Sequence, residues 1–190
     1  MTRPVLVCQG FQRAFIDVDG PMFSLSASVR RSICEQVLKR ARTSGWTVVH
    51  SFLDTETLGT AGGASMDGFA PSPTEAYFRQ RSLSAFRTAG FHAKLESVAD
   101  RPVYLISFAG LSVIAATFLD GLERRLPIRI VTDAVADIAH SGVDERDRLE
   151  AIEVLARAHG RDATSHDLAT AAGLPPRPSH RNQLFADGVL

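Results

Sequence analysis

Residues 103–136 read VYLISFAGLSVIAATFLDGLERRLPIRIVTDAVA and contain a complete strand–helix–strand pattern. Val103–Phe108 is a continuous apolar run of strand length, which is typical of a strand covered on both faces, and Ile128–Thr132 is a second such segment. Between them, Val113–Leu122 is apolar almost all round, which predicts a helix that packs deeply. Two strands joined by a helix predict a parallel pair with a right-handed crossover.

The same alternation of strand-like and helix-like segments extends outward from this unit. Ser24–Thr43 and Arg146–Ala158 carry apolar residues at helical spacing with charged residues between them, so they predict amphipathic helices. Strands that alternate with helices predict a parallel sheet covered on both faces. We therefore predict an α/β fold, a three-layer αβα sandwich with a mainly parallel, Rossmann-like sheet. The other strand-length apolar runs are Val5–Cys8, Thr47–Phe52 and Ala76–Phe78.

Two segments depart from this alternation. Asp54–Pro73 carries four glycines, two prolines and few apolar residues, which predicts a long loop. Thr164–Ala172 predicts one short helix, which the sequence Gly-Leu-Pro-Pro-Arg-Pro ends. The predicted organisation is one α/β domain over residues 1–163, followed by a C-terminal helix and tail over residues 164–190.

Length and charge limit the partners that the chain is expected to have. Its 190 residues, with a mass of 20.6 kDa, fit a single domain. Lys and Arg number 21, as do Asp and Glu, so no overall field would attract nucleic acid or anionic lipid. The N-terminal sequence does not resemble a signal peptide, and no apolar run approaches about 18 residues. We expect a soluble, cytoplasmic protein without nucleic-acid or membrane partners.

Motifs for metals and phosphates are not found in the sequence. Gly59–Gly63 is glycine-rich but lacks the Lys-Ser/Thr of a phosphate-binding loop, and no two of the six histidines are four residues apart. We therefore predict no metal site and no cofactor. Cys8 and Cys34 lie in apolar segments and are expected to be buried thiols rather than a disulfide. Ser112, near the start of a predicted helix, fits either a helix cap or a nucleophile.

Four pieces of the chain, in order, resemble the isochorismatase-like cysteine hydrolases, a family that includes nicotinamidases, carbamoylases and isochorismatases. The resemblance covers residues 4–160 and implies the same α/β fold and a tendency to form homo-oligomers. The four pieces are VLVCQGFQRAFID at 5–17, GASMDGFAPSP at 63–73 with SAF at 84–86, VIAATFLDGL at 113–122, and IRIVTDAVA at 128–136.

The resemblance also implies where the catalytic residues of the family would lie. In that family a cysteine thiolate attacks the substrate, an aspartate accepts the thiol proton and a lysine stabilises the developing charge. Alignment of the first piece places Gly10 at the aspartate position. Alignment on the Ser-Ala-Phe turn places Gln80 at the lysine position, and alignment on the third piece places Val113 at the cysteine position. None of these three side chains can perform the corresponding step.

The leading hypothesis is therefore a catalytically degenerate relative that binds a small molecule or acts as an assembly partner. Its pocket is expected at the carboxyl ends of the strands, where parallel α/β sheets bind ligands. Arginine, glutamine and aromatic side chains there could hold an anionic or planar ligand, although both arginines could equally lie on the surface. The predicted pocket residues are Gly10, Phe11, Tyr77, Arg79, Gln80, Arg81 and Val113.

Two other hypotheses stay open at this stage. The first is an active hydrolase of C–N or vinyl-ether bonds with a non-standard nucleophile, for which Ser112, Cys8 and Asp17 are the candidates. A one-residue shift in the alignment would bring Ser112 or Arg81 into the site. The second is an interaction module that depends on the tail from Gly173 onward.

Overall fold

The computed structural model describes residues 2–20, 22–54, 56–138 and 144–171. Six parallel strands form one sheet in the order β3-β2-β1-β4-β5-β6. The strands are β1 (Val5–Gln9), β2 (Thr47–Leu53), β3 (Ala76–Gln80), β4 (Val103–Ser107), β5 (Ile128–Val135) and β6 (Asp162–Ala163).

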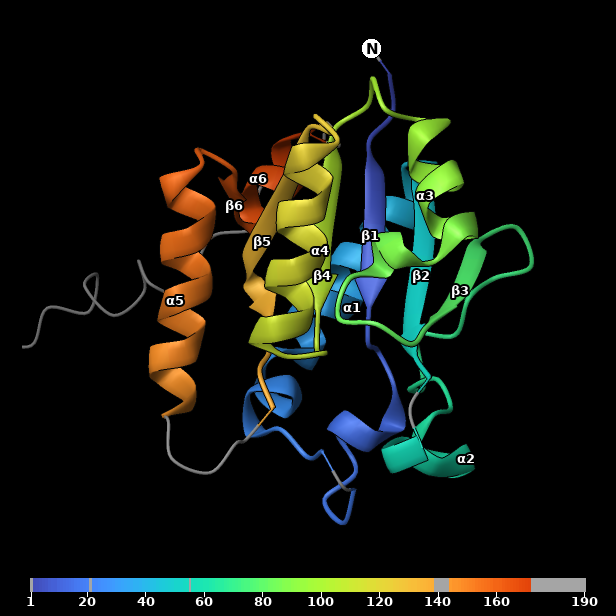
Figure 1. Cartoon of the computed structure of the whole chain (residues 1–190), viewed down its shortest axis with the longest axis vertical. Coiled ribbons are helices and arrows are strands. Elements are labelled where there is room, and N and C mark those ends of the chain that lie inside the picture. The colour runs from blue at the N-terminus through green and yellow to red at the C-terminus, as the bar shows by residue number, and fades with distance from the viewer. Residues whose placement is uncertain (1, 21, 55, 139–143, 172–190) are drawn as a thin grey trace, which may run out of the picture.

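Helices cover both faces of the sheet, as Figure 1 shows, so the predicted α/β sandwich is confirmed. The helices α3 (Ala89–Glu96), α4 (Leu111–Glu123) and α5 (Glu145–Ala158) lie on one face. The helices α1 (Leu25–Thr43) and α6 (Ser165–Ala171) lie on the other face, where α1 contacts both β2 and β5. No helix in the described part of the chain is long and apolar enough to span a membrane.

Three segments differ from the expectations. The stretch predicted as one long loop contains two short helical turns, η2 (Glu56–Leu58) and α2 (Gly59–Gly62). The helix α3 and the two-residue strand β6 were not predicted, because α3 is short and β6 shows no apolar run. The predicted short helix is α6, whereas the predicted tail lies outside the described residues.

The core consists of two apolar layers, one on each face of the sheet. Alternate residues of β1 enter the two layers: Leu6 and Cys8 pack beneath α1, and Val5 and Val7 pack beneath α3 and α4. At the carboxyl end of the sheet the α1-side layer ends in stacked rings, with the centroids of Phe11 and Phe69 4.5 Å apart. This packing fixes the strand ends that carry the candidate site.

Candidate functional site

The cavity of interest lies where the chain changes direction across the sheet. From β1 the chain builds β2 and β3 on one side and then crosses to β4 on the other, so the order of strand addition reverses between the paired strands β1 and β4. Such a switch point is where parallel α/β sheets bind ligands. A cavity of about 750 Å³ opens there, and we call it the edge cavity. Its lining is Met22, Leu53, Gln80, Arg81, Ser82, Leu83, Ala109, Gly110, Leu111, Ser112, Val113, Asp137, Ile138 and Arg148.

Gly10 lies just beyond β1 and packs directly against the wall of this cavity. Its backbone has φ of +72°, a conformation that favours glycine. A Cβ atom at position 10 would lie 2.6 Å from the Cβ of Ala109 and 2.9 Å from its backbone nitrogen. Ala109 in turn lines the edge cavity. The space that the Cβ atom of a side chain at position 10 would need is therefore occupied by Ala109, in the segment that follows β4.

Gln80 forms part of the cavity floor, but its carboxamide is fully committed to protein partners. Its Nε2 donates to the carbonyl oxygens of Ser82 (2.9 Å) and Leu83 (3.2 Å). Its Oε1 accepts from Gln9 Nε2 at 3.0 Å and from the Ser51 hydroxyl at 2.5 Å. A carboxamide can make two donor and two acceptor bonds of this kind, so Gln80 has none left for a ligand.

The same buried network ties the sheet to α4. Gln9 Nε2 also donates to the hydroxyl of Thr117, which lies one helical turn beyond Val113. The Thr117 hydroxyl accepts a second bond from the backbone N–H of Ala85, at 3.1 Å. Val113 is thereby held with its aliphatic side chain, 7% exposed, in the cavity wall.

The first turn of α4 is held by Asp137, a residue that the sequence analysis missed. Asp137 Oδ1 accepts the backbone N–H of Leu111 at 2.7 Å, while its Oδ2 pairs with Arg148 Nε. The Asp137 backbone is fixed by Ser24 and Ser26, whose hydroxyls bond its carbonyl oxygen and its N–H respectively. The sequence feature that could have identified Asp137 is its position two residues after β5, at the same edge of the sheet as Gly10.

The other four predicted pocket residues lie in four different places. Arg81 lines the edge cavity, and its Nε contacts Asp54 Oδ2 at 2.9 Å. Arg79 also pairs with Asp54, at 3.6 Å, and lines a neighbouring cavity of about 860 Å³. Tyr77 is 41% exposed on the outer strand β3, with the Arg79 guanidinium over its ring. Phe11 is fully buried in the ring stack rather than in the cavity lining.

The three candidate nucleophiles do not meet in one site. Cys8 is fully buried in β1, and this burial, together with the Glu75 charge, raises the pKa of its thiol far above the usual range. Asp17 pairs with Arg13 at 3.2 Å and lines a separate surface cavity. Ser112 is exposed at the rim of the edge cavity, and no hydrogen-bond partner for its hydroxyl is found among the described residues. Within that part of the chain, no group of three His, Cys, Asp or Glu could hold a metal ion.

The strand order, the helices on both faces and the cavity at the switch point define a Rossmann-like α/β protein with a cavity of small-molecule size. A sequence model of the isochorismatase domain matches residues 4–165. The chain therefore belongs to the isochorismatase family, as the resemblance had predicted. A search of curated proteins finds no match.

Solved structures share this fold. A cysteine hydrolase from Pseudomonas syringae pv. phaseolicola 1448A aligns with a TM-score of 0.79 and 14% identity, over 90% of this chain and 92% of that chain. An isochorismatase family protein from Desulfovibrio vulgaris subsp. vulgaris str. Hildenborough aligns with a TM-score of 0.76 and 19% identity, over 90% of this chain and 100% of that chain. An N-carbamoylsarcosine amidase from Thermoplasma acidophilum aligns with a TM-score of 0.68 and 22% identity, over 86% of this chain and 97% of that chain.

Proposed function

We propose that this chain is a non-catalytic member of the isochorismatase family that binds a small molecule in the edge cavity. The fit between Gly10 and Ala109 carries the proposal. The resemblance implies that position 10 is the place of the general base, and here a Cβ atom at that position would overlap Ala109. Covalent catalysis by the family's route needs a carboxylate there, and the packing supports its absence.

The other two positions favour the same function. Val113 presents an aliphatic side chain where the resemblance implies the nucleophile, and Gln80 has no hydrogen-bonding capacity left where it implies the lysine. The cavity itself remains, with a volume of about 750 Å³ that is ordinary for a ligand site. Loss of the reactive groups with retention of the cavity is the pattern expected of a binding protein.

The hydrolase alternative receives less support from the same geometry. A serine nucleophile needs a base within hydrogen-bond reach, and no such partner of Ser112 is present among the described residues. A cysteine nucleophile needs to be a thiolate in contact with the substrate, whereas Cys8 is buried and its pKa is raised. Self-association, which the family resemblance implies, and a cytoplasmic location also remain part of the proposal. Light scattering of the purified chain tests self-association.

Reactivity of the folded chain tests the proposal. The full chain is incubated with 4-nitrophenyl acetate, an activated ester, and with N-ethylmaleimide, and the peptides are mapped by mass spectrometry. We expect no acetylated Ser112, no rapid labelling of Cys8, and equal nitrophenol release by the wild type and Ser112→Ala. Ester turnover that disappears in Ser112→Ala, or fast and saturable labelling of Cys8, would show a working nucleophile and overturn the proposal.

A further inference from the structure

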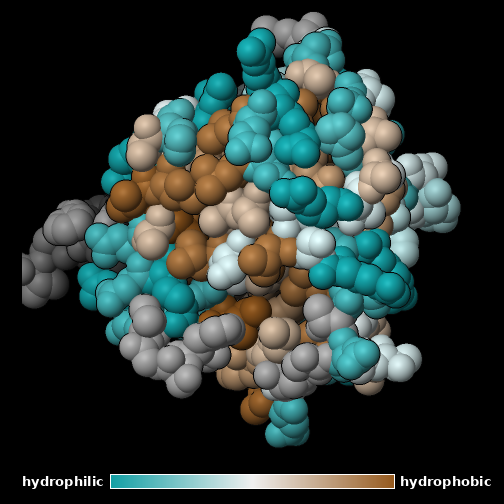
Figure 2. All heavy atoms as spheres, viewed as in Figure 1, coloured by the Kyte–Doolittle hydropathy of each residue, from teal (hydrophilic) through white to brown (hydrophobic). Residues whose placement is uncertain are grey.

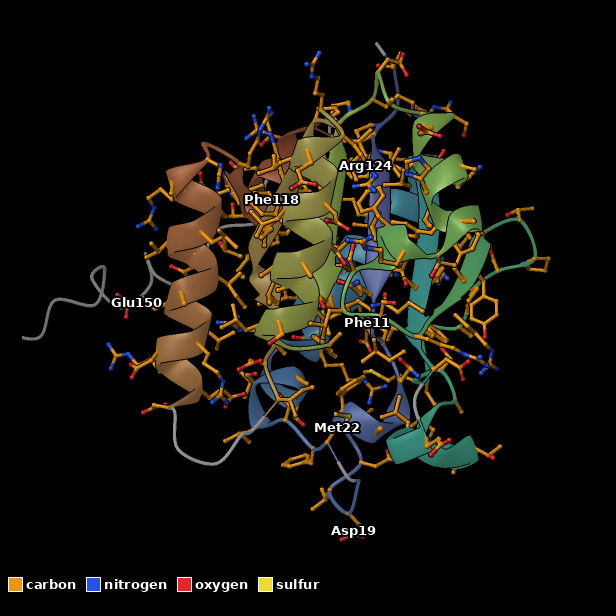
Figure 3. All side chains as sticks on the ribbon, in the orientation of Figure 1. Phe11, Asp19, Met22, Phe118, Arg124 and Glu150 are labelled. Atoms are coloured by element: carbon orange, nitrogen blue, oxygen red, sulfur yellow. The ribbon has the colours of Figure 1, made fainter. Side chains whose placement is uncertain are left out.

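The edge cavity is lined largely by apolar side chains. Met22, which Figure 3 labels below the first turn of α4, closes one side of it. Val113 and Ala109 close the side next to the sheet, and Leu83 lies at the mouth, 59% exposed. Figure 2 shows that hydrophobic residues also gather on the face of the molecule that carries α4. The apolar residues of the lining are Met22, Leu53, Leu83, Ala109, Leu111, Val113 and Ile138.

Each charged side chain of the lining already has a partner of opposite charge. Arg148 pairs with Asp137 inside the cavity wall, where their side chains are only 11% and 5% exposed. Arg81 pairs with Asp54 and is otherwise in water, with 83% of its side chain exposed. Asp137 further accepts the Leu111 amide, so the N-terminal end of α4 already faces a carboxylate. The buried charges of the cavity are therefore balanced before any ligand arrives, whereas the exposed Arg81 shares the Asp54 carboxylate with Arg79.

Gln80, the polar residue of the cavity floor, likewise has protein partners for its hydrogen bonds. All four hydrogen-bonding positions of the Gln80 carboxamide are used by the protein. A charged ligand inside the cavity would therefore either disrupt the buried Arg148–Asp137 pair or be buried without a counter-charge, and both events are unfavourable. The exposed Arg81 offers an anion only a weak, solvent-screened attraction. An uncharged ligand avoids both costs and gains from the apolar walls.

We propose that the edge cavity selects an uncharged, mainly apolar small molecule over anionic and cationic molecules of the same shape. This inference rests on the proposed function, because it names the ligand class of that site. It narrows the earlier hypothesis of an anionic or planar ligand to an uncharged one, because the two arginines that favoured an anion both contact Asp54 and are 62% and 83% exposed to solvent.

Three naphthalene derivatives of similar size provide the test. Methyl 2-naphthyl ketone is uncharged at neutral pH, 2-naphthoate is an anion and 2-naphthylmethylammonium is a cation. Each is titrated into the full chain at pH 7.5, and its Kd is measured by calorimetry or by naphthalene fluorescence. We expect the ketone to bind tightest, by roughly tenfold or more over either ion, which corresponds to about 1.4 kcal/mol or more.

A pair of exposed leucines supplies matched variants. Leu83→Arg places a charge at the cavity mouth, while Leu119→Arg changes a 41% exposed leucine of α4 that does not line the cavity. The role of Leu83 in the Gln80 network is a backbone carbonyl, which the substitution leaves in place. We expect Leu83→Arg to weaken ketone binding at least about tenfold, and Leu119→Arg to leave it unchanged.

The outcomes separate the two proposals. If an ionic probe binds tightest and Leu83→Arg changes its Kd, the cavity is a ligand site and only the inference about charge is overturned. If none of the three probes binds, or if binding is indifferent to Leu83→Arg, the proposed ligand site falls, and the inference falls with it.

Discussion

Gly10 follows the last residue of β1, and its left-handed backbone brings it against Ala109, in the segment that follows β4. This close approach depends on two properties of glycine. One is tolerance of a positive φ angle, and the other is the lack of a Cβ atom. Position 10 is therefore closed to a side chain by packing between neighbouring strand ends as well as by the identity of the residue.

These two properties can be separated by a pair of substitutions. Gly160→Ala changes a glycine with φ of +61° and no atom within 4 Å of the added Cβ, so it should cost only the backbone strain, about 1 kcal/mol. Gly10→Ala adds overlap with Ala109 and should cost about 2–4 kcal/mol of unfolding free energy. Urea denaturation measures both. Equal losses in the two variants would contradict the close approach at Gly10.

A second residue-scale feature lies away from the cavity, on β2. His50 is fully buried, its Nε2 lies 2.9 Å from Glu75 Oε2, and its Nδ1 has no partner among the described residues. Burial lowers the pKa of His50, outweighing the opposite effect of Glu75. Burial also opposes ionisation of Glu75, but hydrogen bonds from Arg42, the Ser72 amide and His50 prevail and lower its pKa to about 2.

The pH dependence of stability follows from these directions. Between the lowered pKa of folded His50 and the ordinary value of about 6.5, the unfolded chain binds a proton that the folded chain does not, so stability falls as the pH falls. Glu75 stays ionised in the folded state down to pH about 2, and its contribution is lost below the ordinary glutamate pKa of about 4.3. We expect the loss of stability between pH 7 and 5 to be smaller in His50→Gln, measured by urea denaturation at each pH. The exposed His166→Gln is the control, and an unaltered slope in His50→Gln would contradict this assignment.

At the scale of elements, α4 is fixed at its first turn by a residue from beyond β5. The helix has glycine at its N-cap, which offers no side chain to its first N–H groups, and Asp137 takes that role from another part of the chain. Ser24 and Ser26 of the α1 start hold Asp137 in turn. Three elements thus converge on one wall of the edge cavity.

Removal of this carboxylate should loosen the wall. Asp137→Ala deletes the acceptor of the Leu111 N–H and the ion pair with Arg148, and should cost about 2–4 kcal/mol of unfolding free energy. Asp137→Asn retains an oxygen for the N–H and should recover part of the loss. Asp54→Ala breaks exposed pairs with Arg79 and Arg81 and should cost less than about 1 kcal/mol. Thermal denaturation ranks the three, and equal effects of Asp137→Ala and Asp54→Ala would refute the buried role of Asp137.

The sequence predicted elements well where their pattern was long. The strands β1, β2, β4 and β5 and the helices α1, α4 and α5 follow from apolar runs and helical spacing. The helix α3 was missed because it spans only eight residues, and β6 because two residues carry no periodicity. Asp137 was missed for another reason: its role depends on contacts with Ser24, Leu111 and Arg148, which only the folded chain brings together.

At the scale of the whole molecule, the parallel sheet explains which predictions about the site could succeed. Alignment with the family selected Gly10, Gln80 and Val113, and the sheet, which places all carboxyl ends at one edge, brings Gln80 and Val113 into the lining of the edge cavity and Gly10 against its wall. Side-chain directions could not be assigned in this way. Phe11 therefore turned out to lie in the ring stack, and Tyr77 on the outer surface of β3.

The fate of a bound ligand tests the central claim most directly. A ligand that binds the edge cavity, identified by a binding screen that includes amides and esters, is incubated with a molar excess of the full chain, and both are analysed by mass spectrometry. The account predicts that the ligand is recovered chemically unchanged and that the mass of the protein stays the same. A hydrolysed ligand or an acylated protein, absent in Ser112→Ala, would show instead that the cavity belongs to a working hydrolase.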